Sequence, residues 1–463
     1  MNRRAEKSLL SWKDSNHRKP LLLLGARQVG KTWLMNEFGR KYFEKVLYIR
    51  FDRNEQMRQL FERSSYDMNE LLLLLQAAAR FKITPGDTLI ILDEIQECPA
   101  ALTSLKYFCE DLPEYHVMAA GSLLGVHQHR GTGFPVGKVH TLHLYPMSFP
   151  EFLDALGYGY DVEIIESGNW ANIKLFAERY THLLKLYYYI GGMPEVVSTY
   201  IETQDFAEVR RVQNEILSNY ANDFSKHVPA SLAAKLSLLW DSVPEQLAKE
   251  NRKFIFAEVQ KNMRARDLED AMDWLIRAGL VYRTPRINEA ALPISAYRDG
   301  AFKLYFSDVG LLSAKVGLDI SVLVEKTSVF REFKGALTEQ YVQQQMRAEC
   351  ALEPHYWQSD TARAEIDFII QQGMHVVPVE VKAETNTRAK SLMSYCRKYQ
   401  PHVAVRCSMN DYHKQEIVHS EESVTQLIDI PLYAVSQMTK ECKAALGLND
   451  IPTPALPPPN GKI

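Results

Sequence analysis

The sequence predicts an α/β fold built on a parallel sheet that carries a phosphate-binding loop. Short, almost continuously apolar runs alternate with amphipathic segments over the first third of the chain. Such runs are typical of parallel strands buried on both faces, and the alternation favours a sheet covered by helices on both sides. The first run, LLLL at 21–24, leads directly into Gly25-x4-Gly30-Lys31-Thr32.

The order strand, glycine loop and helix is the context in which this motif binds phosphate. Glycines let the backbone turn tightly and aim its N–H groups at phosphate oxygens, and the helix N-terminus adds partial positive charge. Lys31 is suited to the β- and γ-phosphates and to catalysis, and the Thr32 hydroxyl is suited to Mg²⁺. We expect ATP to be bound by Gly25, Ala26, Arg27, Gln28, Val29, Gly30, Lys31, Thr32 and Trp33.

The stretches around this loop continue the alternation. Asp67 is a suitable helix N-cap, and Pro85-Gly86-Asp87 predicts a turn before an apolar run. In chain order we expect a short helix within 1–18, a strand at 46–51, a helix at 67–80, a strand at 88–92, a helix at 100–111 and a strand at 117–120.

Two carboxylates follow the strand at 88–92. At the carboxyl end of a parallel strand, one carboxylate can hold Mg²⁺ and its neighbour can orient the attacking water. We assign Asp93 to the metal and Glu94 to the water. Ser122 ends the next strand, where it either acts as a catalytic sensor of the γ-phosphate or caps the following helix; the sequence leaves both roles open.

Composition sets the limits for the whole chain. With 463 residues, 46% of them hydrophobic and 24% charged, the chain is typical of a soluble globular protein of about three domains. A net charge of −3 excludes a chain that is basic throughout, but not a local basic groove. The six cysteines have neither metal-binding nor disulfide spacing, which predicts a cytoplasmic protein. The most hydrophobic run, at 71–75, is too short for a membrane span.

A loop and a helical region follow. Residues 126–140 are glycine-rich and carry Arg130 and Lys138, and a strand at 142 precedes a capped helix. Helices are expected at 175–190 and 207–224, joined through the sequence GGMP at 191–194. A helical region after a nucleotide-binding core predicts a lid over the nucleotide.

The next segment has the pattern of a winged helix-turn-helix. A short element at 254–259 precedes a helix at 267–278 and a strand at 280–284. Exposed arginines near such a helix can contact DNA phosphates, and the candidates are Arg264, Arg266 and Arg277. The alternative is that this unit only packs other domains together.

Four charged residues of the C-terminal region form the third candidate site. Glu339 lies on a helix expected at 334–348, and Asp367 and Glu380 lie on adjoining strands of a hairpin. Lys382 shares a strand face with Glu380, because strand side chains repeat every two residues. We expect Asp367 and Glu380 to bind Mg²⁺ or Mn²⁺, with Glu339, Asp367, Glu380 and Lys382 as catalytic residues for phosphodiester cleavage. The alternative is an exposed charged hairpin.

As a set, these motifs resemble a large prokaryotic family of AAA+-type P-loop ATPases. The C-terminal region of that family is a domain of unknown function similar to PD-(D/E)xK nucleases. The resemblance covers about residues 15–440 and rests on GARQVGKT at 25–32, LDEIQ at 92–96, AAGSLLG at 119–125, LYPMSFPEF at 144–152, GGMPE at 191–195, SDVGLLS at 307–313, GALTEQYV at 335–342, AEIDFII at 364–370 and VEVKA at 379–383.

The resemblance implies ATP and Mg²⁺, a lid, a winged-helix segment and a fold like that of restriction endonucleases. It implies an N-terminal helix at 1–18, a P-loop core at 19–155, a lid at 156–230, a winged-helix-like domain at 231–320, a nuclease-like domain at 321–445 and a proline-rich disordered tail at 446–463. The family commonly has Gly-Arg where this chain has Gly137-Lys138. If that arginine acts as a finger across a subunit interface, Lys138 is a weaker substitute because it lacks the planar guanidinium, and Arg130 could take over.

Two functions compete on this basis. The first is a Mg²⁺-dependent ATPase coupled to DNA binding or processing through the nuclease-like domain. The second is an ATP-dependent regulatory or partner-binding switch with a non-catalytic nuclease-like domain. We expect DNA as a partner, a homo-oligomer or a protein partner as further possibilities, and no membrane.

Overall fold

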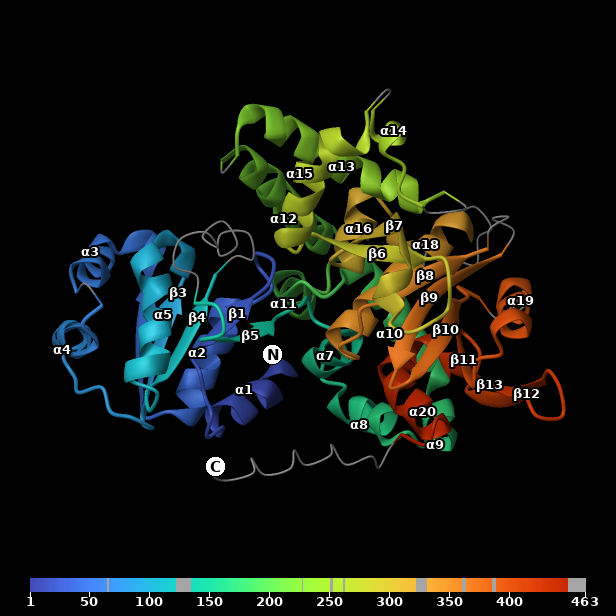
Figure 1. Ribbon diagram of the computed structural model, residues 1–463, viewed down its shortest axis with the longest axis horizontal. Coiled ribbons are helices and arrows are strands. Elements are labelled where there is room, and N and C mark those ends of the chain that lie inside the picture. Colours follow the sequence, from blue (N-terminus) through green and yellow to red (C-terminus); the bar gives the residue numbers. More distant parts are fainter. Residues whose placement is uncertain are drawn as a thin grey trace, which may run out of the picture.

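A computed structural model of the chain describes residues 1–64, 66–121, 135–226, 228–249, 253–260, 263–321, 331–359, 364–384 and 389–448. Ser122, Arg130 and the expected disordered tail from residue 449 lie outside these ranges. The protein is a mixed α/β molecule with two sheets, one of five strands near the N-terminus and one of eight strands near the C-terminus (Figure 1).

The five-stranded sheet is entirely parallel, as the apolar runs predicted. Its strands run in the order β2-β3-β4-β1-β5, so that β4 separates β1 from β3. The strands are β1 (Leu21–Leu24), β2 (Lys45–Arg50), β3 (Thr88–Asp93), β4 (His116–Ala120) and β5 (His140–His143). The carboxyl ends of all five strands therefore lie at one edge of the sheet, where the phosphate loop and Asp93 meet.

Helices cover both faces of this sheet. Leu21 and Leu23 share a core with α1 (Ala5–Lys13) and α2 (Lys31–Tyr42), whereas Leu22 and Leu24 belong to a second core. Side chains alternate between the two faces of a strand, so a run of four leucines fills both cores. The second core includes side chains of α3 (Glu55–Arg63), α4 (Met68–Ala79) and α5 (Pro99–Asp111). The Asp67 carboxylate accepts hydrogen bonds from two N–H groups of α4, which confirms the predicted N-cap.

A run of helices follows β5 and connects the two sheets. Ser148 and Glu151 form the capping box that starts the first of these helices. The helices are α7 (Phe149–Ala155), α8 (Gly159–Ser167), α9 (Trp170–Leu175), α10 (Ala177–Ile190), α11 (Pro194–Thr203) and α12 (Phe206–Lys226). The GGMP sequence lies between α10 and α11.

The segment expected to form a winged helix has its helices followed by a hairpin, but that hairpin is not a free wing. Its antiparallel strands are strands of the C-terminal sheet, because Arg286 and Ile287 of β6 pair with β8. One sheet therefore crosses the boundary expected at residue 320. The elements are α13 (Ala230–Leu247), α14 (Phe256–Val259), α15 (Ala265–Arg277), β6 (Val281–Ile287), β7 (Arg298–Phe306) and α16 (Val309–Lys315).

The eight-stranded sheet runs in the order β12-β13-β11-β10-β9-β8-β6-β7. Beyond the hairpin its strands are β8 (His355–Gln358), β9 (Glu365–Gln372), β10 (His375–Val381), β11 (Val403–Ser408), β12 (His413–Val418) and β13 (Val424–Pro431). Its helices are α18 (Arg331–Ala348), α19 (Lys390–Tyr399) and α20 (Met438–Ala445). The strands β9 and β10 form the predicted antiparallel hairpin.

A buried junction joins the helical region to the C-terminal part. Asp308 is buried and accepts a hydrogen bond from the Gly192 N–H at 2.6 Å, and the Gly192 carbonyl accepts one from the Met147 N–H at 2.6 Å. A side chain at Gly310 would place its Cβ 2.3 Å from the Ile190 carbonyl oxygen. Glycine is therefore required where these backbones meet.

Helix α18 adds buried glutamines to this junction. Gln340 binds both the N–H and the carbonyl of Phe306, and Gln344 accepts from the Val309 N–H. Gln345 accepts from the N–H of Phe149, the first residue of α7. Buried amide side chains thus satisfy backbone groups of two separate chain segments, one at 306–309 and one at Phe149, as buried polar groups require.

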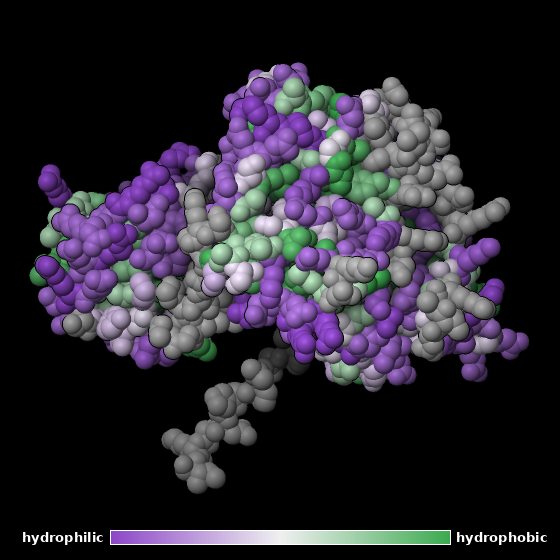
Figure 2. All heavy atoms as spheres, turned by 90° about the horizontal axis from the view of Figure 1, so that it is seen from above, coloured by the Kyte–Doolittle hydropathy of each residue, from purple (hydrophilic) through white to green (hydrophobic). Residues whose placement is uncertain are grey.

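Figure 2 shows a mostly hydrophilic surface on the lobe at the left, which carries β1–β5. Among the described residues, none of the helices combines the length and apolar character that a bilayer crossing requires.

Candidate functional site

The phosphate loop connects β1 to α2 in a conformation that depends on its glycines. Gly30 has a φ of 92°, in the left-handed region, and a Cβ at Gly25 would lie 2.3 Å from the Leu144 carbonyl oxygen. As at every helix start, the first N–H groups of α2 have no acceptor within the helix. The loop therefore presents backbone donors to an anion at the positive end of a helix dipole.

Lys31 bends back over the loop. Its ammonium donates to the carbonyl oxygens of Gly25 at 2.9 Å and Ala26 at 2.8 Å. Burial lowers the pKa of Lys31 to about 8, and the nearby carboxylates of Glu94 and Asp93 oppose this shift. Hydrogen bonds from an ammonium to neutral carbonyls are weaker than those to charged phosphate oxygens. The Lys31 ammonium is therefore suited to exchange the carbonyls for phosphate oxygens.

The structure brings the loop and the two carboxylates together. The Thr32 hydroxyl donates to Asp93 Oδ2 at 2.8 Å, and the Tyr48 hydroxyl donates to the same oxygen at 2.7 Å. A hydroxyl and a carboxylate in contact at the end of a helix are the oxygen ligands that Mg²⁺ takes beside phosphates, so this pair fits the ion.

Glu94 is held in an unusual backbone conformation. Its φ is 51°, which is uncommon for a residue with a side chain, and its Oε2 accepts a hydrogen bond from the Gln96 amide at 2.6 Å. Gln96 therefore fixes the direction of the Glu94 carboxylate. This role of Gln96 was not predicted.

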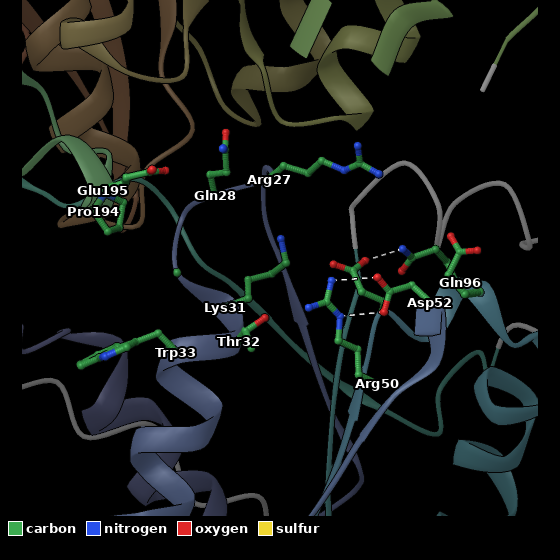
Figure 3. A pocket seen from close by; sticks show the side chains of 13 residues that line it. Arg27, Gln28, Lys31, Thr32, Trp33, Arg50, Asp52, Gln96, Pro194 and Glu195 are labelled. Atoms are coloured by element: carbon green, nitrogen blue, oxygen red, sulfur yellow. Dashed lines mark hydrogen bonds and ion pairs between the residues drawn. The ribbon is translucent and has the colours of Figure 1, made fainter. Parts of the chain in front are cut away.

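These residues line a cavity of about 560 Å³. Figure 3 shows Trp33, Pro194 and Glu195 on one side of the loop, and Arg50, Asp52 and Gln96 on the other, with Lys31 between them. The Trp33 side chain is exposed. One side of the cavity thus offers an aromatic ring and the other offers charged and amide groups.

Comparison with known proteins agrees with this geometry. Residues 17–153 match the family model of an AAA domain. Two further matches are to domains of unknown function, DUF8612 over residues 181–321 and DUF4143 over residues 334–433. None of the curated proteins matches the chain.

Solved structures with a similar course of the chain have low sequence identity. A Walker-type ATPase of Pyrococcus abyssi, PABY2304, is 14% identical over 68% of this chain and 95% of its own, with a TM-score of 0.43. The Orc1 protein of Aeropyrum pernix in complex with DNA is 14% identical over 70% and 92%, with a TM-score of 0.27. Drosophila ORC bound to DNA is 14% identical over 68% and 94%, with a TM-score of 0.25.

Residues outside the loop motif hold the loop of the AAA domain in place. The Arg3 guanidinium is buried and donates to the carbonyls of Val29 at 2.8 Å and Tyr145 at 2.6 Å. It also pairs with Glu151 of α7 at 3.1 Å. Sequence reasoning missed Arg3, because nothing in its local pattern links it to a loop far along the chain.

The helical region also contacts the loop, through α12. The Tyr220 hydroxyl donates to the Arg27 carbonyl at 2.8 Å, and the Arg27 guanidinium pairs with Asp223. These contacts fall on the segment that was expected to form a lid. The α12 helix therefore touches the phosphate loop itself.

The three carboxylates of the candidate site in the C-terminal part each have a hydrogen-bond or ion-pair partner of their own. Glu339 Oε2 accepts from the Tyr305 hydroxyl at 3.2 Å, whereas Asp367 Oδ2 accepts from the Val381 N–H at 2.7 Å. Glu380 Oε1 lies 2.5 Å from the Lys382 ammonium. Burial, with Asp367 nearby, raises the pKa of Glu380 to about 7, and Lys382 opposes this.

Across the described ranges, no three His, Cys, Asp or Glu side chains form a group suited to a metal ion. The register does place Asp367 and Glu380 on neighbouring strands, since Phe368 pairs with Val379. Glu380 faces Lys382, the lysine predicted beside it, whereas Glu339 faces Lys303, a lysine that was not predicted.

The basic residues expected to contact DNA or a neighbouring nucleotide are engaged locally. Arg266 lies 3.9 Å from Asp267, and Arg277 lies 3.6 Å from Asp273. Arg264 is exposed at the start of α15, a helix that also exposes Glu269, Asp270 and Asp273. Lys138 pairs with Glu110 of the same chain at 2.9 Å.

Proposed function

We propose that the AAA domain binds ATP with Mg²⁺ and hydrolyses it, and that the nucleotide state is passed to the C-terminal sheet. The observation that carries this proposal is the 2.8 Å hydrogen bond from the Thr32 hydroxyl to Asp93 Oδ2. It joins the phosphate loop to the carboxyl end of β3, so that both potential metal ligands lie beside the lysine that faces the phosphates.

Each residue has a distinct role in this proposal. Lys31 leaves the carbonyls of Gly25 and Ala26 and binds the β- and γ-phosphates, while Thr32 and Asp93 hold the metal. Mg²⁺ supplies charge neutralisation of the phosphate oxygens when it is bound. Glu94, directed by Gln96, orients the attacking water.

The two sides of the cavity suggest the orientation of the nucleotide. Trp33 and Pro194 offer apolar surface to the base, and stacking on an exposed indole is favourable for any nucleobase. Arg50, Asp52 and Gln96 lie on the opposite side (Figure 3), where the γ-phosphate and the water belong.

The ATPase proposal is tested by phosphate release and equilibrium nucleotide binding on the full chain. Lys31→Ala should abolish binding, because it removes the cation that faces the phosphates. Glu94→Gln should retain binding and lose turnover by about 100-fold or more. Equal hydrolysis by the wild type and Glu94→Gln would rule out the role given to Glu94.

A continuous set of contacts supports transmission from the loop to the C-terminal sheet. Tyr220, which donates to the Arg27 carbonyl, packs edge-on against Trp240, with ring centroids 6.4 Å apart. Trp240 in turn packs on Phe306 at 4.4 Å, and Phe306 is hydrogen-bonded to Gln340 of α18. If a nucleotide displaces the loop, it therefore shifts a row of packed side chains that runs from the loop to α18.

Hydrogen exchange tests this transmission. In the wild type, a nucleotide should change exchange in α12, β7 and α18, and Tyr220→Phe should reduce the change in β7 and α18 while the nucleotide still binds. Tyr189→Phe is the matched control, because its hydroxyl also bonds a backbone carbonyl, that of Phe206 at 3.4 Å, away from the loop. An unaltered response in Tyr220→Phe would refute the proposed route.

For the C-terminal part, we infer a partner-binding role in preference to cleavage. The carboxylates of Glu339 and Glu380 each face a lysine, and the basic residues of α15 are balanced by exposed acidic ones. Nuclease activity is the second candidate, because Asp367, Glu380 and Lys382 are adjacent on one hairpin. Metal-dependent cleavage of plasmid, linear and branched DNA, lost in Asp367→Ala, would establish the second candidate and displace the first.

A further inference from the structure

A lysine of the hairpin β6–β7 is buried in the acidic cluster of the C-terminal sheet. The side chain of Lys303 is 0% exposed, and its ammonium lies 2.5 Å from Glu365 Oε1 and 3.7 Å from Glu339 Oε2. It also lies 4.9 Å from the centre of the Tyr356 ring. Burying an ammonium is costly unless carboxylates and aromatic faces replace its water, and here both are present.

The position of this ammonium conflicts with a metal bound by the same carboxylates. A hard divalent cation needs oxygen ligands at about 2.0–2.6 Å and repels a positive charge beside it. Glu339 Oε2, the oxygen that a metal would need, is directed at Lys303 and the Tyr305 hydroxyl. The Lys303 ammonium therefore already serves as the cation beside these carboxylates, and it is part of the chain itself.

The cluster comprises the carboxylates of Glu339, Glu365 and Glu380, and one oxygen of Glu380 has no hydrogen-bond partner in the described part of the chain. Glu380 is 3% exposed, and its Oε2 has no hydrogen-bond donor among the residues that the structure describes. Its other oxygen faces Lys382. The cluster thus retains oxygen atoms that are able to bind a cation, although lysines take up the nearest positions.

We propose that Lys303 is the resident cation of this cluster and that it excludes a divalent metal from the wild-type protein. Removing its charge leaves the buried Glu339 and the partly exposed Glu365 without the cation that they share, and neighbouring carboxylates repel one another. A divalent cation relieves this repulsion, so that a neutral residue at 303 converts the cluster into a metal site. This inference goes beyond the proposed ATPase and does not depend on it.

The origin of Lys303 in the chain explains why the C-terminal sequence alone suggests a metal site. Lys303 lies in the segment matched by DUF8612, whereas Glu339, Glu365 and Glu380 lie in the segment matched by DUF4143. The acids and their counter-charge therefore belong to different segments, which pair only in the folded sheet.

The test is a Mn²⁺ titration of the full chain without nucleotide. Electron paramagnetic resonance measures the free Mn²⁺ at each step. All variants carry Asp93→Asn, which removes the carboxylate assigned to the metal of the phosphate loop. The Lys303→Met protein should gain one Mn²⁺ per chain, bound at least about tenfold more tightly than by the parent. That gain should be lost in Lys303→Met/Glu339→Gln.

Two controls keep the result interpretable. Lys315→Met removes another lysine that is paired with a carboxylate, Asp241, and should not gain Mn²⁺ binding. Lys303→Gln serves if Lys303→Met does not fold, because its amide still donates hydrogen bonds but carries no charge. Mn²⁺ binding by the parent that is lost in Asp367→Ala would overturn the proposal, and so would the absence of binding in every folded variant at residue 303.

Discussion

Raising the pH from 7 to 9 should weaken nucleotide binding through the deprotonation of a single lysine. Burial lowers the pKa of Lys31 to about 8. About 90% of this side chain is then charged at pH 7 and about 10% at pH 9. Phosphate oxygens bind the ammonium form and raise its pKa, so binding takes up a proton and affinity falls as pH rises through about 8.

The expected size of the effect follows from these fractions. Affinity should fall about tenfold between pH 7 and pH 9, which corresponds to about 1.4 kcal/mol. At pH 9, close to 0.9 proton should be taken up for each nucleotide bound, by the same arithmetic. The nucleotide adds little to this change, because a phosphate loses its last proton at about pH 6.

Calorimetry with ADP and Mg²⁺, in buffers with different heats of ionisation, measures both quantities. Lys31→Arg is the matched control, because a guanidinium stays charged throughout this range and should bind weakly but without the pH dependence. Equal ADP affinity at pH 7 and pH 9, with no proton uptake by the wild type, would refute the assignment of Lys31 as a phosphate ligand with a lowered pKa.

Four further outcomes test other parts of the structure. Gln96→Ala should lower the rate of ATP hydrolysis and leave ATP affinity unchanged, because it frees the Glu94 carboxylate; an unchanged rate contradicts this role. Trp33→Ala should weaken ATP binding by about tenfold but leave tripolyphosphate binding intact, since stacking on the base is worth about 1–3 kcal/mol. In thermal unfolding, Gly310→Ala should cost at least about 2 kcal/mol, because its Cβ would lie 2.3 Å from a carbonyl oxygen; a wild-type melting temperature contradicts the close approach. ATPase activity per chain should rise with protein concentration if a neighbouring copy completes the site, and constant activity from nanomolar concentration upward rules this out.

Local signals in the sequence were sufficient for the AAA domain. The run of leucines at 21–24, the glycine loop and the Asp67 N-cap each act within a few residues, and the structure contains the strand, the loop and the capped helix. The junction of Thr32 with Asp93 also followed from the sequence, because the carboxyl ends of parallel strands meet at one edge.

The features that were not predicted depend on contacts between distant segments. The strand expected at 280–284 was assigned to a winged-helix unit, because a strand pattern does not specify which sheet the strand joins. Arg3 and Lys303 act through partners that are far away in the chain, Val29 and Glu365. The strand hairpin that carries Asp367 and Glu380 was predicted, and so was Lys382 beside Glu380, but Lys303, which pairs with Glu365 and Glu339, comes from another segment.

The junction around Asp308 has a consequence for how the protein unfolds. Gly192, Met147 and Asp308 share buried hydrogen bonds, and the glutamines of α18 bond to the backbones of Phe149 and Phe306. Truncating the chain anywhere between these segments would leave buried N–H and carbonyl groups without hydrogen-bond partners. Each such group lowers the free energy of unfolding by about 1–3 kcal/mol. The helical region and the C-terminal sheet should therefore melt in one cooperative transition, and neither should be recoverable as a stable fragment.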